Sequence, residues 1–105
     1  MNKKIKTKAI DKLFEAIRTL KTEEECYAFF EDVCTVNELL ALAQRYEVAL
    51  MLRQDKTYME IAKQTGASTA TISRVNRSLS FGNDGYDLTF SRMEGLDLPE
   101  KKEEE

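Results

Sequence analysis

Hydrophobic residues recur with the period of an α-helix along most of the chain. The first segment places Ile10, Leu13, Phe14, Ile17 and Leu20 on one apolar stripe of a helix. Three threonines are each followed, three positions later, by a glutamate, which is the spacing of a helix-starting capping box. These pairs are Thr22 with Glu25, Thr35 with Glu38, and Thr57 with Glu60. We predict an all-α protein and no strand.

The helix predicted over 36–53 is apolar on more than one side. Its hydrophobic residues cover most of the helix circumference, so the helix has to be buried on several sides. A chain of 105 residues has few other elements with which to surround it. We therefore predict a homodimer in which a second copy of the chain covers this helix. A monomer with a central helix is the alternative.

Residues 58–77 follow the pattern of a helix-turn-helix. A short helix over about 58–65 ends at Gly66, a residue that takes the left-handed conformation of a tight turn, and Ser68 caps a second helix that ends at about Leu79. Small or apolar residues stand where such helices pack together: Ile61, Ala62, Thr65, Ala67, Ile72 and Val75. This packing leaves one face of the second helix free to enter a major groove.

The side chains expected on that free face suit contact with double-stranded DNA. Small hydroxyls and methyls let a helix approach base edges, and arginines reach phosphates or a guanine. The predicted DNA-binding residues are Thr57, Tyr58, Lys63, Ser68, Thr69, Ala70, Thr71, Ser73, Arg74 and Arg77. A hairpin used only for protein contacts would present apolar residues on this face instead. Use as an interaction module in a larger complex, without specific DNA binding, is the alternative function.

The end of the chain differs in composition from the rest. A weaker helical segment is expected over about 87–94, so residues 1–94 form one domain with its helix-turn-helix at about 57–79. The acidic residues 95–105 are expected to form a disordered tail. The cysteines, Cys26 and Cys34, are expected to be small buried residues without a disulfide.

The composition excludes several classes of function. The absence of histidine removes imidazole catalysis and imidazole metal sites, and no phosphate loop or nucleophile–base pair is present. We predict no enzyme activity, metal or cofactor. No apolar run approaches the roughly 20 residues that cross a bilayer, and the N-terminus lacks the apolar core of a signal peptide. A cytoplasmic protein is expected.

Taken over the whole chain, the net charge of −3 argues against a nucleic-acid partner, but the charged residues are unevenly distributed. Residues 1–22 carry seven basic and two acidic side chains, and residues 53–80 carry five and two. Residues 23–52 carry one and seven, and residues 81–105 carry three and eight. The helix-turn-helix is thus locally basic. We expect modest non-specific affinity and a strong reliance on base contacts.

Residues 35–79 resemble the Trp repressor family, in its less characterised Trp repressor-like branch. The resemblance rests on TVNELLALAQR at 35–45, EIA at 60–62 and GASTATISRVNRSL at 66–79. It implies an all-helical, intertwined homodimer with two helix-turn-helix units that bind a palindromic operator. It also implies a transcriptional regulator that acts as a repressor.

Family members that bind tryptophan use a pocket beside the second helix, and the resemblance carries over a candidate effector pocket. Its residues here are Thr35, Arg45, Arg74, Val75 and Ser78. Val75 stands where the family has a glycine that leaves room for the indole, and Asp32 and Cys34 replace two apolar pocket residues. Added bulk in a packed pocket costs about 1–3 kcal/mol. Tryptophan is therefore not the expected ligand, and a different small effector, or none, stays open.

Overall fold

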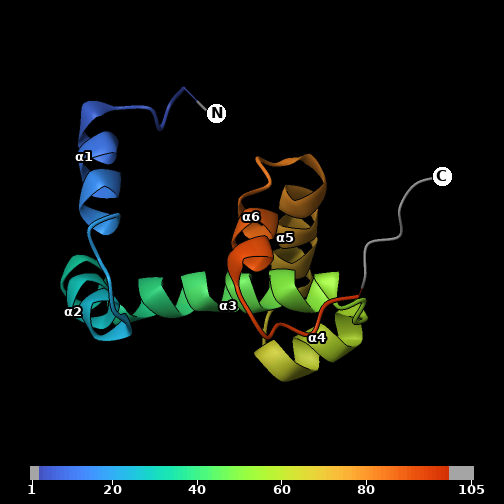
Figure 1. Ribbon diagram of the computed structural model, residues 1–105. Coiled ribbons are helices and arrows are strands. Elements are labelled where there is room, and N and C mark those ends of the chain that lie inside the picture. The colour runs from blue at the N-terminus through green and yellow to red at the C-terminus, as the bar shows by residue number, and fades with distance from the viewer. Residues whose placement is uncertain (1–2, 100–105) are drawn as a thin grey trace. The chain divides into compact units, whose positions relative to one another are not determined.

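The computed structural model describes residues 3–99, which contain six α-helices and no strand (Figure 1). The helices are α1 (Lys8–Ile17), α2 (Glu23–Val33), α3 (Val36–Arg53), α4 (Tyr58–Thr65), α5 (Thr69–Phe81) and α6 (Gly85–Arg92). The all-α prediction is confirmed, and α3 and α4 have the predicted bounds. The last helix begins and ends two residues earlier than predicted.

Capping boxes start two of the helices as the sequence predicts. At α4 the Thr57 hydroxyl accepts from the Glu60 backbone N–H at 3.1 Å, and the Glu60 carboxylate accepts from the Thr57 N–H at 2.8 Å. Thr35 and Glu38 make the same exchange at α3. At α2 the Glu25 carboxylate instead accepts from the N–H of Lys21, so that box is incomplete. These caps satisfy backbone N–H groups that have no partner within a helix.

The chain divides into two compact units: unit 1 runs to Leu39, and unit 2 begins at Leu40. The helix α3 contributes to both. Among the described residues of unit 1, none is buried. Its exposed hydrophobic residues include Phe14 at 52% and Tyr27 at 58%. Cys26 is exposed on α2 and Cys34 is half-buried at its end, so the expectation of two buried cysteines is wrong for this single chain.

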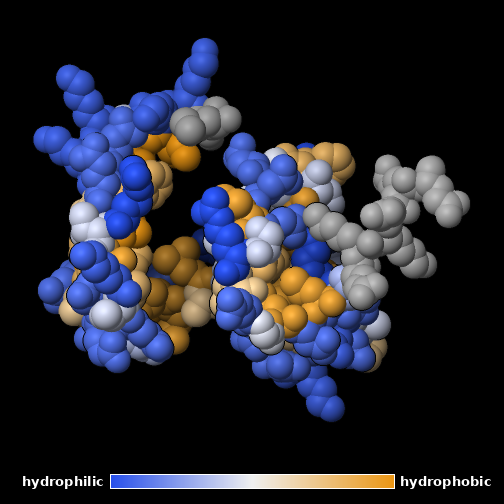
Figure 2. Space-filling view, in the orientation of Figure 1, coloured by the Kyte–Doolittle hydropathy of each residue, from blue (hydrophilic) through white to orange (hydrophobic). Residues whose placement is uncertain are grey.

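Unit 2 contains the hydrophobic core. Its nine buried residues come from α3, α4, the turn after α4, α5 and α6: Val48, Ala49, Met51, Ile61, Ala67, Ile72, Val75, Leu79 and Phe90. Hydrophobic side chains also reach the surface of both units, among hydrophilic ones (Figure 2). The helices that follow α3 thus enclose its second half. They provide the burial that the hydrophobic pattern of this half predicts.

An ion pair holds α6 to the core helices. Arg53 of α3 donates to both carboxylate oxygens of Asp87, at 2.9 and 2.8 Å, and to the carbonyl of Leu79 in α5. The hydrogen bond to Asp87 raises the pKa of Arg53 above its ordinary value. Because a guanidinium binds a carboxylate through two parallel bonds, the contact also fixes the orientation of α6.

The chain after α6 packs against the core over its first few residues. Leu96 and Leu98 contact the core cluster, and Gln54 donates to the carbonyl of Asp97 at 2.9 Å. The prediction of a disordered tail from residue 95 is therefore wrong for these positions, since two leucines find apolar partners there. The rest of the predicted tail, residues 100–105, lies outside the described residues.

Candidate nucleic-acid interface

The turn between α4 and α5 is built from backbone geometry and a threonine. Gly66 has φ +73°, the left-handed conformation, and its N–H donates to the carbonyl of Ala62 at 2.9 Å. The Thr65 hydroxyl donates to the carbonyl of Ile61 and accepts from the Ala67 N–H. Gln44 of α3 donates to the carbonyl of Thr65 at 3.1 Å. The turn is thus fixed both locally and against α3.

The helix α5 buries one face and exposes the other. Ile72, Val75 and Leu79 are buried in the core. Five of the residues predicted to bind DNA are exposed on this helix: Thr69, Ala70, Ser73, Arg74 and Arg77. Of the six predicted packing positions, Ile61, Ala67, Ile72 and Val75 are buried, and the other two, Ala62 and Thr65, are half-buried. The arrangement is that of a helix-turn-helix whose second helix presents polar and small side chains outward.

Two hydroxyls of the predicted set also serve the start of α5. The Ser68 side chain accepts from the backbone N–H of Thr71 and donates to the Thr71 hydroxyl, both at 3.1 Å. Thr71 is half-buried. These two residues therefore shape the helix N-terminus, a position where backbone N–H groups favour a phosphate.

The helix α4 and the N-cap residue before it present three further residues of the predicted set. Thr57, Tyr58 and Lys63 are all exposed. The Thr57 hydroxyl is engaged in the capping box, and the same box lowers the pKa of Glu60 because its carboxylate accepts the Thr57 N–H. Lys63 carries a positive charge on the exposed side of α4, so this helix can meet a phosphate backbone through its second half.

Two exposed residues beside this set were not predicted. Asn76 of α5 donates from its amide nitrogen to the Tyr58 hydroxyl at 3.1 Å, which joins the two helices. Met59 is 82% exposed. Helical spacing from the buried Ile61 and Val75 could have placed both residues near the surface. The bond between Tyr58 and Asn76, whose partners lie 18 positions apart, has no signal in the sequence.

The candidate effector residues have different surroundings. Val75 is 2% exposed and belongs to the core. Ser78 lines an open cavity of about 430 Å³ in unit 2, together with Tyr46, Gly82, Asn83, Gly85 and Tyr86. In unit 1 the Thr35 hydroxyl caps α3. The lining of this cavity does not include Arg74 or Val75, so it differs from the predicted set.

Comparison with known proteins decides the family. The family model described as Trp repressor protein matches residues 8–94. The chain belongs to the Trp repressor family. It is 56% identical over 90 residues to the Bacillus subtilis (strain 168) protein YerC, itself uncharacterised, with 86% of each chain covered. This family consists of DNA-binding regulators and not of enzymes.

Two solved structures from the same family have the same fold. A TrpR-like protein from Eubacterium eligens ATCC 27750 is 62% identical, with a TM-score of 0.88 over 91% of this chain and 99% of that one. A provisional Trp repressor from Staphylococcus aureus is 52% identical, with a TM-score of 0.87 over 91% and 95%. Within residues 3–99, no helix is long and apolar enough to cross a membrane.

Proposed function

We propose that this chain is a sequence-specific transcriptional repressor that acts in the cytoplasm and binds a palindromic operator as a homodimer. The observation that carries the proposal is the outer face of α5. There Ser73, Arg74 and Arg77 are exposed while the opposite face is buried in the core. Hydroxyls and guanidinium groups on one helix face can read base edges and hold phosphates.

The dimer in this proposal is supported by the surface of unit 1. Its described helices bury no residue, yet they carry the apolar stripe of α1 and exposed Tyr27 and Val33 on α2. The first residues of α3 add Val36, which is 75% exposed. Burying hydrophobic area is the main favourable term in association, so a second copy of the chain is the partner we propose for this surface.

Selection from a random pool of DNA duplexes tests the proposal. The full chain is incubated with the pool at fixed salt, with and without tryptophan and other amino acids, and the bound duplexes are sequenced. We expect a palindrome whose half-sites lie about one helical turn, roughly 34–36 Å, apart. A bound pool with no shared sequence would refute specific binding. Capture of a protein partner after nuclease treatment, with no DNA shift, would favour the interaction-module function.

Two variants separate phosphate contacts from base contacts. Arg77→Ala should weaken binding to every duplex and reduce the slope of log K against log salt by about one for each subunit. Ser73→Ala should weaken binding only to duplexes with particular bases at one position of the half-site. Equal losses on all sequences from both variants would contradict these assignments.

A further inference from the structure

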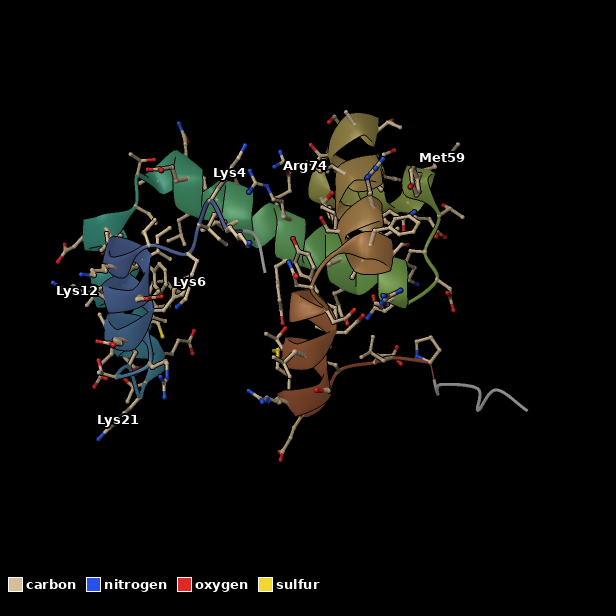
Figure 3. All side chains as sticks on the ribbon, turned by 90° about the horizontal axis from the view of Figure 1, so that it is seen from above. Lys4, Lys6, Lys12, Lys21, Met59 and Arg74 are labelled. Atoms are coloured by element: carbon tan, nitrogen blue, oxygen red, sulfur yellow. The ribbon has the colours of Figure 1, made fainter. Side chains whose placement is uncertain are left out.

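Met59 is a strongly exposed hydrophobic residue at the start of α4, beside the predicted DNA-binding residues Thr57 and Tyr58. Its exposed fraction is 82%, compared with 37% for the neighbouring Tyr58. Figure 3 shows the side chains of Met59 and Arg74 on either side of α5 in unit 2. The thioether therefore projects from the start of α4, the first helix of the helix-turn-helix.

The polar neighbours of Met59 are held by the protein itself. Tyr58 is joined to Asn76 of α5 by the 3.1 Å hydrogen bond, which ties the start of α4 to the second helix. Glu60 is turned back onto the Thr57 N–H at 2.8 Å. Met59 is left to extend outward from a helix end whose orientation to α5 is fixed.

The chemistry of Met59 limits what it can contact on DNA. A thioether has no donor hydrogen, so it cannot hold a phosphate as Lys63 or Arg77 can. The major groove presents one apolar group, the C5-methyl of thymine. We propose that Met59 determines specificity by packing on a thymine methyl beside the base pairs reached by α5. This inference rests on the proposed DNA-binding function.

Replacing thymine by deoxyuridine removes only the methyl group and so tests the contact directly. Each thymine of the selected operator is replaced in turn, and binding is measured for the wild-type chain, Met59→Gln and Met59→Leu. The wild-type chain should lose about fourfold in affinity at one thymine of each half-site, the value for one buried methylene-sized group. Met59→Gln should show no loss there, whereas Met59→Leu should keep most of it.

Lys63→Gln is the matched control on the same helix. It should weaken binding to the thymine and deoxyuridine duplexes by the same factor, because it removes only a phosphate contact. If Met59→Gln responds to deoxyuridine at every position as the wild-type chain does, the inference is wrong; a contact between Met59 and deoxyribose would give that result. If the wild-type chain does not distinguish the operator from scrambled DNA, the proposed function itself fails.

Discussion

Unit 1 and unit 2 differ in how far their hydrophobic residues are buried. Unit 2 encloses nine of them in a core that spans four helices, and the described residues of unit 1 bury none. Both units nevertheless have helices with an apolar side and regular caps. The difference teaches that unit 2 buries a hydrophobic core within one chain, whereas the apolar side of unit 1 is exposed in the single chain. We assign DNA binding to the outer face of α5 in unit 2, and dimerisation to the apolar side of unit 1.

The largest effect is expected in the core of unit 2. Ile61 is fully buried between α4 and the core, so Ile61→Ala should lower the free energy of unfolding by about 2–5 kcal/mol. Urea denaturation at a fixed chain concentration measures the loss. Met59→Ala, two positions earlier and exposed, is the control and should change it by less than about 0.5 kcal/mol. Similar losses of unfolding free energy from both variants would contradict the distinction between the buried Ile61 and the exposed Met59.

The next effect tests the surface of unit 1. Phe14 is half exposed in this chain, so Phe14→Asp should cost little unless a second copy covers it. We expect the dissociation constant of the dimer to rise at least about tenfold, because a carboxylate is costly to bury in an apolar interface. Sedimentation equilibrium measures it, with Met59→Asp as an equally charged control on unit 2. A wild-type chain that sediments as a monomer would contradict the proposed dimer.

A smaller effect concerns the turn of the helix-turn-helix. An added Cβ at Gly66 meets no atom within 4 Å, so Gly66→Ala should act only through its positive φ and cost about 1–2 kcal/mol. Gly85→Ala also meets no atom, at a position without positive φ, and should be neutral or stabilising by up to about 1 kcal/mol. Thermal unfolding of the two variants checks this contrast, and equal shifts would show that φ is not the cause.

The smallest effect is the pH dependence of the α4 capping box. The folded-state pKa of Glu60 lies below its ordinary value of 4.5 because the carboxylate accepts the Thr57 N–H. The ionised group therefore stabilises the folded chain above pH 4.5, and this contribution is lost as the pH falls through the lowered pKa. The difference in unfolding free energy between the wild-type chain and Glu60→Gln should narrow over that range. If this difference in unfolding free energy stays constant down to pH 2, the ionised Glu60 of the capping box is not its source.

Local signals explain why α3, α4 and the turn could be predicted from the sequence. Threonine–glutamate pairs and Gly66 act within a few residues, so they define helix ends without knowledge of the tertiary fold. The start of α6 was predicted two residues too late. Asp84 takes the left-handed conformation, with φ 60°, and Gly85 already belongs to the helix. A glycine in a turn-like segment gives no sign of that.

Long-range contacts explain the errors and omissions. Leu96 and Leu98 pack on the core cluster, and Gln54 binds the carbonyl of Asp97 across 43 positions. The acidic composition around the leucines concealed these contacts. The bond between Tyr58 and Asn76 depends on the angle between two helices. Val75 is buried with Ile72 and Leu79, as its apolar spacing predicted, and its place in an effector pocket stays a prediction.

The central claim is that α5 reads a DNA sequence. The affinity of the wild-type chain for its selected palindrome, divided by its affinity for a scrambled duplex of equal length at the same salt concentration, tests it most directly. Specific regulators prefer their sites by about a thousandfold or more, and we predict a ratio of that order. A ratio close to one would contradict the account, however tightly both duplexes are bound.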